Sequence, residues 1–180
     1  MARIILIRHC QSSGQAPDAP LTRAGAHAAR VLADRLQTLA PDAVYSSPYK
    51  RAVMSARPFA QRAGLAIIEE PRLHERVLAE APLDDWLDHI RRSYGDVDHR
   101  PGPGGETLRE TQRRGGAAMA DIAAAGHRLA VAVSHGNLIC AVLRSVDPSF
   151  GFEDWRGLRN PDLFELTMDQ RRPSRFVRLG

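Results

Sequence analysis

The stretch Arg3-Ile4-Ile5-Leu6-Ile7-Arg8-His9-Cys10-Gln11-Ser12 joins a nearly unbroken apolar run to an arginine, a histidine and short polar residues. The apolar run is rich in β-branched side chains, which is typical of a strand buried on both faces of a parallel sheet. Arg8 and His9 would then lie at the carboxyl end of that strand. Ligands bind at this end of open α/β sheets, so the stretch predicts a site for an anion such as phosphate.

Strand and helix patterns alternate along the rest of the chain. Thr22 is a typical helix N-cap, and apolar residues spaced three and four apart predict an amphipathic helix that ends before Pro41. Further strands are expected at 42–46, 65–69, 129–134, 163–168 and 175–179. This alternation predicts an α/β fold, a three-layer α/β/α sandwich with a mostly parallel central sheet.

The dipeptide Ser47-Pro48 has the pattern of a helix start, with a capping hydroxyl followed by proline at the first helical position. The predicted helix carries Arg51 one turn from its start and ends at Gly64. Pro58 lies inside this segment and predicts a kink or an early end.

The pattern changes between Pro71 and Gly105, where prolines are frequent and only a short amphipathic helix, at 83–94, is expected. We therefore predict a single catalytic domain over 1–180 with a lid-like excursion at about 71–105. A helix is expected from 104 to about 125, although Gly115-Gly116 in its middle disfavours it. A later helix is expected at 138–146.

Composition restricts the classes of function. The chain has 180 residues, 43% of them hydrophobic, and a net charge of +4. Lys50 is the only lysine, and the arginines are spread along the chain, as on a solvated basic surface that would also tolerate anionic ligands. The hypothesis of a nucleic-acid-binding protein would rest only on this charge and on the basic tail 171–175, which lacks interleaved aromatic residues. We expect no nucleic-acid partner.

The two cysteines, Cys10 and Cys140, are far apart and have no metal-like spacing, so free thiols are expected rather than a disulfide or a zinc site. The apolar run near the N-terminus is too short for the core of a signal peptide, and no later segment approaches the length needed to span a membrane. These features predict a cytoplasmic protein without a membrane partner.

Four pieces of the sequence carry groups suited to phosphate chemistry: Arg8-His9, Arg51, Glu75 and Ser134-His135. Three of them follow strands, and the junctions from strand to helix collect along one edge of such a sheet because the crossovers are right-handed. Phosphoryl transfer needs a nucleophile, cations that neutralise the phosphate oxygens, and a proton donor for the leaving oxygen. The four pieces together supply all three.

Six short motifs carry a family resemblance. They are Arg8-His9-Cys10-Gln11-Ser12, Leu21-Thr22-Arg23-Ala24-Gly25, Ser46-Ser47-Pro48-Tyr49-Lys50-Arg51-Ala52, Leu73-His74-Glu75, Gly104-Gly105-Glu106-Thr107 and Ser134-His135-Gly136. With these motifs in this order, the sequence resembles the histidine phosphatase superfamily, also called the phosphoglycerate mutase-like family. The resemblance covers most of the chain.

The resemblance implies a catalytic set. His9 would be the nucleophile that becomes phosphohistidine, Arg8 and Arg51 would clamp the phosphate, and His135 would add a further donor. Glu75 would serve as general acid and base, with Glu69, Glu70 and Glu80 as neighbouring alternatives. The flanking arginines favour a neutral imidazole, whose unprotonated nitrogen can attack.

The same resemblance predicts the phosphate-binding residues Arg8, Gln11, Ser12, Arg51, His135 and Gly136, with no metal and no cofactor. The tetrapeptide 104–107 either touches substrate or only starts a helix. Cys10 replaces the family glycine beside the nucleophile, and Gln15 stands where asparagine is frequent. Cys10 would narrow the pocket or make the site sensitive to oxidation.

The function expected from these features is hydrolysis of small phosphorylated metabolites through phosphohistidine on His9. Two alternatives are a phosphoglycerate mutase and a catalytically impaired phosphate-binding regulatory protein, the latter suggested by Cys10. The brief excursion at 71–105 favours the phosphatase over the mutase. A homodimer is expected by resemblance only.

Overall fold

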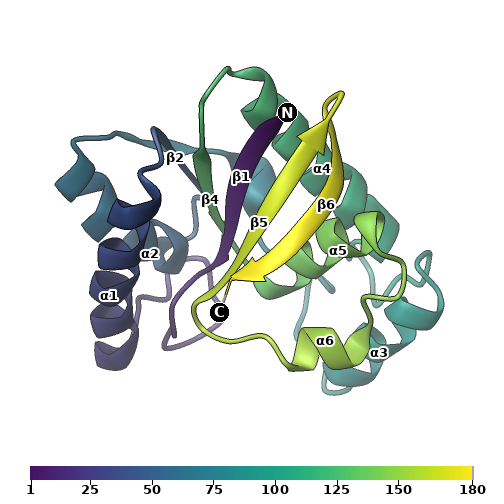
Figure 1. Ribbon diagram of the computed structural model, residues 1–180. Coiled ribbons are helices and arrows are strands. Elements are labelled where there is room, and N and C mark those ends of the chain that lie inside the picture. Colours follow the sequence, from purple (N-terminus) through teal and green to yellow (C-terminus); the bar gives the residue numbers. More distant parts are fainter. Residues whose placement is uncertain (180) are drawn as a thin grey trace.

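The apolar run near the N-terminus forms β1 (Ala2–Arg8), inside a six-stranded sheet with the order β3-β2-β4-β1-β5-β6 (Figure 1). The computed structural model describes residues 1–179. β2 (Ala43–Ser46), β3 (Ile67–Glu69) and β4 (Ala130–Ser134) run parallel to β1. β5 (Asp162–Asp169) and β6 (Arg172–Leu179) are antiparallel and form one side of the sheet. The mostly parallel sheet is therefore confirmed.

Helices cover both faces of this sheet (Figure 1). α1 (Arg23–Leu39) and α2 (Lys50–Ala63) share a core with Ile5 and Ile7 of β1. α4 (Leu108–Ala124) and α5 (Gly136–Val146) share a core with Ile4 and Leu6. The alternate side chains of β1 thus enter opposite cores, which explains why its apolar run is continuous. The three-layer α/β/α sandwich predicted from the sequence is confirmed.

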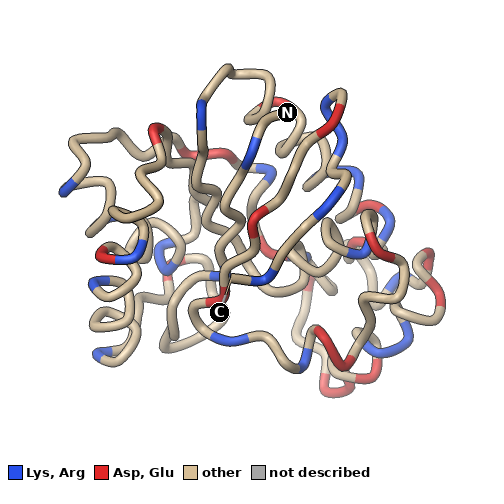
Figure 2. Tube along the Cα trace, viewed as in Figure 1, with Lys and Arg blue, Asp and Glu red and all other residues tan. Residues whose placement is uncertain are grey.

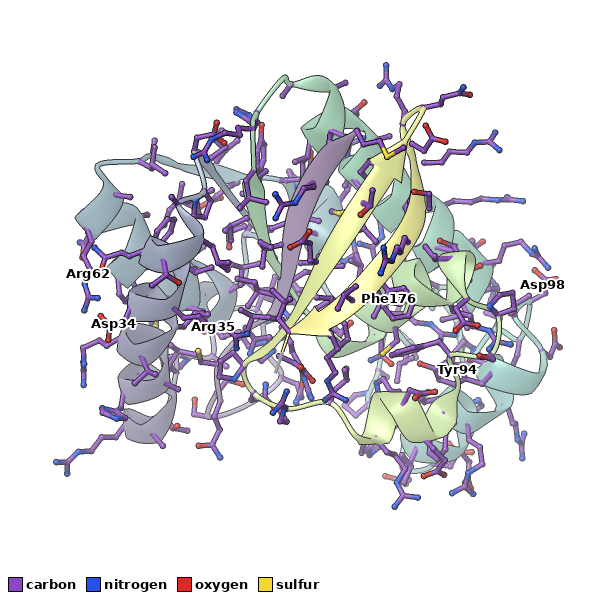
Figure 3. All side chains as sticks on the ribbon, in the orientation of Figure 1. Asp34, Arg35, Arg62, Tyr94, Asp98 and Phe176 are labelled. Atoms are coloured by element: carbon purple, nitrogen blue, oxygen red, sulfur yellow. The ribbon has the colours of Figure 1, made fainter. Side chains whose placement is uncertain are left out.

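The two helices of the first layer differ in how well the sequence predicted them. Thr22 caps α1 as expected, since its hydroxyl accepts a hydrogen bond from Gly25 N at 3.0 Å. Arg62 of α2 pairs with Asp34 of α1, and Figure 3 shows their side chains meeting on the outer side of the layer.

The prediction for the start of α2 was wrong, and Pro58 does not end the helix, while a kink at Pro58 stays a prediction. The helix begins at Lys50, three residues after Ser47, and its N-cap residue is Tyr49, which makes no side-chain cap. The Ser47 hydroxyl accepts from Tyr49 N at 3.2 Å, ahead of the helix. The helix also continues through Pro58 to Ala63 and ends, as expected, at Gly64, whose φ of 66° is left-handed. Burial of Phe59 and Ala60 against the sheet holds the segment beyond the proline in helical form.

The glycine pair does not interrupt α4, and a close helix contact explains why. Thr107 and Glu110 form a capping box at its start. A Cβ on Gly115 would lie 2.7 Å from Cγ2 of Val142 in α5, so glycine lets these two helices approach. α5 itself begins two residues earlier than predicted, with His135 as its N-cap residue.

The segment 71–105 contains a 3-10 turn (Pro71–Leu73) and α3 (Trp86–Gly95). α3 contacts α6 (Phe152–Arg156), a short helix that the sequence analysis did not predict. Tyr94 of α3 packs on Phe152 with ring centroids 6.3 Å apart, and it is labelled beside α6 in Figure 3. Both helices lie near the end of the sheet where β1 finishes (Figure 1). That this segment acts as a lid stays a prediction.

Charged residues of both signs alternate along the chain trace (Figure 2). Most of the recorded ion pairs are exposed, as for Arg109 with Asp98. Among residues 1–179, no helix combines the length and the apolar character that crossing a membrane requires.

Candidate active site

The carboxyl ends of β1, β2 and β4 bring three polar segments together. Arg8 pairs in register with Ser134 across β1 and β4. His9 N donates to the carbonyl oxygen of Ser134 at 3.0 Å, and Ser47 N donates to that of Val133 at 2.9 Å. The predicted convergence at this sheet edge is therefore present, and His9 and His135 lie with their ring centroids 5.0 Å apart.

Two hydrogen bonds fix the orientation of the His9 ring. Nδ1 lies 2.7 Å from the carbonyl oxygen of Cys10, which can only accept, so Nδ1 carries the proton. Nε2 accepts from Nε of Arg51 at 3.1 Å. Burial, followed by the charges of Arg51 and Arg8, lowers the pKa of His9 to about 4. The ring is therefore neutral near pH 7, with the lone pair of a nucleophile at Nε2.

Arg51 is only 1% exposed, although its guanidinium is charged. Besides the bond to His9, its Nη1 donates to the carbonyl oxygens of Gln15 and Ala16 at 3.0 and 2.8 Å. The Tyr49 ring centroid lies 5.0 Å from its Cζ. No carboxylate forms an ion pair with Arg51 among the described residues, so an incoming anion would supply charge that the buried cation lacks.

Arg8 and His135 each present an unused nitrogen. Arg8 Nη1 donates to the carbonyl oxygen of Leu158 at 3.0 Å, but its Nε is buried and has no partner among the described residues. His135 Nε2 lies 2.8 Å from the Ser47 hydroxyl, and its Nδ1 is likewise buried without a partner. Burial lowers the pKa of His135 well below its usual value. Unpartnered polar nitrogens of this kind suit the oxygens of a phosphate.

The Glu75 carboxylate lies at the N-terminus of α5. Oε1 accepts from Arg76 N at 2.8 Å and from Leu138 N at 3.3 Å, and Oε2 accepts from Asn137 N at 3.3 Å. Its charge acts on both Arg8 and Arg51, where it opposes the effect of burial on their pKa values. Three backbone N–H groups thus hold the Glu75 carboxylate at the start of α5, close enough to Arg8 and Arg51 for its charge to act on both.

The alternatives to Glu75 lie elsewhere. Glu70 binds Arg72 through both oxygens, at 2.9 and 2.7 Å, and Glu69 is exposed in β3. Glu80 is exposed on the outer cavity wall. Glu75 is the candidate that the structure places with the arginines.

The tetrapeptide 104–107 supports the Glu75 segment instead of lining the cavity. Glu106 pairs with Arg114 at 2.7 Å, and Arg114 Nη1 also donates to the carbonyl oxygens of Arg72 and His74. A Cβ on Gly105 would lie 2.0 Å from the Leu78 carbonyl oxygen, which requires glycine there. These contacts fix the backbone on both sides of Glu75.

Gln11 and Ser12 are not brought to the cavity. The Gln11 side chain accepts from the Thr22 hydroxyl at 3.0 Å, and the Ser12 hydroxyl donates to the Gly14 carbonyl oxygen at 3.0 Å. The cavity is lined instead by Gln15 of the same loop. A phosphate-binding role for Gln11 and Ser12 stays a prediction that this placement does not favour.

Cys10 faces away from the site. Its side chain is fully buried in the core beneath α1 and α2, and its N–H donates to the Ser55 hydroxyl at 2.9 Å. Burial raises the pKa of the thiol to about 11, so the thiolate needed for oxidation is scarce near pH 7. The expected narrowing of the pocket was therefore wrong, because the side chain enters the core.

A cavity of about 700 Å³ opens beside these groups. Its inner end is lined by Arg8, Tyr49, Glu75, Gly136 and Asn137. Its outer wall comes from 76–83, Trp86, Ile90 and Trp155. The cavity has the dimensions of a site for a small metabolite.

Sequence analysis gave no role to several residues around His9. Ser47 and Tyr49 lie inside the motif that contains Arg51, so the motif placed them near the site. It did not predict that the Ser47 hydroxyl would contact His135 Nε2 or that the Tyr49 ring would pack against the His135 ring. Asn160 Nδ2 donates to the His9 carbonyl oxygen at 2.8 Å. No motif surrounds Asn160, and only the fold brings it to His9.

The model of the histidine phosphatase superfamily (branch 1) matches residues 4–177. The chain belongs to the histidine phosphatase superfamily. The six motifs lie within the matched residues, and the sheet edge that carries Arg8, His9, Arg51 and His135 is the candidate active site.

Two curated relatives share part of the chain. A probable phosphoglycerate mutase from Enterobacter sp. (strain 638) is 34% identical over 136 residues, which are 67% of this chain and 63% of that protein. Phosphoserine phosphatase 1 from Hydrogenobacter thermophilus is 28% identical over 128 residues, 63% of this chain and 61% of that protein. The chain thus spans less than two thirds of either relative.

Among solved structures, a mycobacterial glucosyl-3-phosphoglycerate phosphatase superposes with a TM-score of 0.78 at 22% identity, covering 99% of this chain and 97% of that one. The two chains therefore share one fold over nearly their whole lengths.

Proposed function

We propose that this protein hydrolyses phosphomonoesters of small metabolites through a phosphohistidine formed on His9. The observation that carries the proposal is the His9 ring, whose proton is held at Nδ1 by the Cys10 carbonyl oxygen while Nε2 faces Arg51. Relatives named as phosphoserine phosphatases support hydrolysis of a phosphate ester, and one named as a probable phosphoglycerate mutase supports phosphoryl transfer on a small metabolite.

In the first step the lone pair of His9 Nε2 attacks phosphorus in line with the ester oxygen. The bond from Arg51 Nε to His9 Nε2 must first be exchanged for one to a phosphate oxygen. A P–N bond forms, the P–O ester bond breaks, and its electron pair stays on the leaving oxygen. Protonated Glu75 gives its proton to that oxygen, so a neutral alcohol leaves.

In the second step water attacks the phosphorus of phosphohistidine. Glu75, now a carboxylate, takes a proton from that water, the P–N bond breaks, and its electron pair returns to Nε2. Arg8, Arg51 and His135 donate to the phosphoryl oxygens in both steps, where charge shifts between attacking and leaving atoms. Inorganic phosphate leaves and the starting state of His9 and Glu75 is restored.

The main alternative is a phosphoglycerate mutase, which would have to retain a bisphosphorylated intermediate. The outer wall of the cavity offers Arg76 as its only cation, and that guanidinium already donates to Ser93 Oγ and to the Glu106 carbonyl oxygen. This arrangement favours release of the alcohol after the first step, followed by hydrolysis of phosphohistidine.

The test is phosphate release from a panel of phosphorylated metabolites in the presence of EDTA. We expect turnover that is lost in His9→Asn and kept in His27→Asn, a histidine on α1 away from the site. With 3-phosphoglycerate, 2-phosphoglycerate appearing faster than free phosphate would show a mutase instead. Phosphate binding without any turnover would show a regulatory protein.

We also propose a cytoplasmic location, which the two free, buried cysteines support because neither is used in a disulfide. Fractionation of the producing cells should place the protein with cytoplasmic markers. Recovery with membranes or outside the cell would contradict this proposal. The homodimer stays a prediction that the mass in solution would decide.

A further inference from the structure

We propose that the outer half of the cavity selects monophosphate esters whose alcohol is bulky, apolar and uncharged, and disfavours alcohols that carry a carboxylate. The proposal rests on the function proposed above for the inner end of the cavity. It names the substrate class that the remaining lining residues recognise.

The outer wall is built from apolar side chains of the segment that leads into α3. Val77, Leu78, Leu83 and Ile90 line it together with the two tryptophans of the chain, Trp86 and Trp155. The two indole rings meet edge to face, with centroids 6.4 Å apart. Aliphatic and aromatic surface of this kind is favourable only for a ligand that is itself apolar.

Trp86 is 46% exposed, which is unusual for so large an apolar ring. The Trp86 ring packs against the Trp155 ring, yet much of its surface still faces solvent. An apolar alcohol in the cavity would cover that surface, whereas a small polar alcohol would leave it wet.

The charges in the cavity argue against an anionic alcohol. Arg8 belongs to the phosphate end, and Glu75 and Glu80 are the lining carboxylates. Glu80, on the outer wall, would repel a substrate carboxylate.

Arg76 is the remaining lining cation, but it is only 3% exposed. Its Nε donates to the Glu106 carbonyl oxygen at 3.0 Å and its Nη2 donates to Ser93 Oγ at 2.9 Å. Its Nη1 is buried and has no partner among the described residues. A carboxylate on the alcohol would gain a cation only by lying against this largely buried guanidinium, where it would lose most of its water.

The proposal predicts how kcat/KM should change with the length of the substrate's alkyl chain. Burial of one methylene is worth about 0.8 kcal/mol, which corresponds to about fourfold in kcat/KM. Along the series ethyl, butyl and hexyl phosphate, kcat/KM should rise at least twofold per methylene, since the cavity wall covers the alkyl chain only in part. The leaving alcohols have similar acidity, so the chemical step is matched across the series.

The decisive comparison is hexyl phosphate against 6-phosphooxyhexanoate, which replaces the terminal methyl by a carboxylate. We expect kcat/KM to be at least tenfold higher for hexyl phosphate. Leu83→Arg, which adds a cation to the wall, should reduce this ratio at least fivefold. Leu87→Arg is the matched control, because Leu87 lies in α3, is 39% exposed and does not line the cavity.

Equal values for the two esters, or a preference for the carboxylate, overturn the proposal. So does a flat series from ethyl to hexyl phosphate with turnover that depends on His9, and in that case the proposed phosphatase function stands. No turnover of any ester overturns both proposals. A ratio that Leu87→Arg lowers as much as Leu83→Arg shows that general surface charge sets the preference and also overturns the inference.

Discussion

The hydrogen bond from Arg51 Nε to His9 Nε2 keeps the lone pair of the nucleophile occupied until a phosphate arrives. The same arginine helps to keep the imidazole neutral, because its charge disfavours a second cation nearby. In the proposed mechanism, Arg51 thus keeps the nucleophile neutral and later binds the phosphoryl group that the nucleophile attacks.

At this scale we expect the His9 ring to stay neutral until the pH falls to about 4, with its proton on Nδ1. Burial is the largest cause of the low pKa, followed by Arg51 and Arg8. Ring ¹⁵N chemical shifts followed from pH 8 to pH 3.5, and assigned with His9→Asn, measure both properties. A midpoint near 6.5, or a proton on Nε2, would contradict the description of the nucleophile.

Glu75→Gln should lower kcat for alkyl phosphates by about 10²–10⁴, because the leaving alkoxide then has no proton donor. The effect on 4-nitrophenyl phosphate should be much smaller for the first step, since nitrophenolate leaves without a proton. The decline of turnover on the alkaline side should also disappear in the variant. Glu69→Gln, an exposed carboxylate of β3, is the control. An unchanged alkaline decline in Glu75→Gln would assign the acid to another residue.

The sequence predicted the reactive side chains better than it predicted the residues around them. His9, Arg8, Arg51, Glu75 and His135 were predicted from motifs, and the structure brings them together. The directions in which the neighbouring side chains point could not be predicted from the motifs. Cys10 enters the core. Gln11 and Ser12 bond to Thr22 and Gly14, because the loop after β1 satisfies its own polar groups.

At the scale of elements, the loop that carries these residues depends on Gly25 in α1. A Cβ there would lie 2.0 Å from the Gln11 carbonyl oxygen, which also accepts from Thr22 N. Gly25→Ala should therefore lower the free energy of unfolding by about 2–4 kcal/mol, as expected for backbone overpacking.

The matched control for Gly25→Ala is Gly116→Ala in α4. A Cβ on Gly116 meets no atom within 4 Å, so alanine there should raise the free energy of unfolding by about 0.5–1 kcal/mol through helix propensity. Urea unfolding of both variants measures the two values. If Gly25→Ala left the free energy of unfolding unchanged, the loop after β1 would have to move aside without cost, which would contradict this prediction.

Elements with a long periodic pattern were predicted well, and short ones were not. α1 has both its cap and its apolar stripe in the sequence, whereas α6 has five residues and too little length for periodicity. The start of α2 was placed too early, since the Ser47 hydroxyl accepts from Tyr49 N before the helix begins. The same hydroxyl lies 2.8 Å from His135 Nε2, a contact over 88 residues that a local pattern does not reveal.

At the scale of the whole molecule, the two buried histidines connect stability to pH. In the folded protein the pKa of His9 is about 4 and that of His135 is well below its usual 6.5. The unfolded chain therefore binds more protons below pH 6.5, and the free energy of unfolding falls as the pH decreases from 6.5 toward 4. For His9 alone the full loss is about 3 kcal/mol.

Urea unfolding between pH 7 and pH 4.5 measures this loss. In His9→Asn the decline should be shallower, because a buried group that takes up a proton on unfolding is gone. A free energy of unfolding that stays constant down to pH 4.5 would mean that both rings titrate normally in the folded protein.

The fold followed from the alternation of strands and helices, since each apolar run could be assigned to one face or both faces of a sheet. The cavity wall did not, because the segment 71–105 has no regular pattern and its position depends on contacts made by Arg114 and Glu106. The proposed substrate preference therefore required the structure, while the proposed reaction class required only the motifs.

The central claim is that phosphate passes through His9, and trapping the enzyme during turnover tests it most directly. The protein is mixed with ³²P-labelled ester, stopped with alkaline denaturant, and digested to locate the label. We predict up to one phosphate per chain on Nε2 of His9, stable in alkali and lost in acid, absent in His9→Asn and present in His27→Asn. Steady turnover without label on His9, or label on another residue, would contradict it.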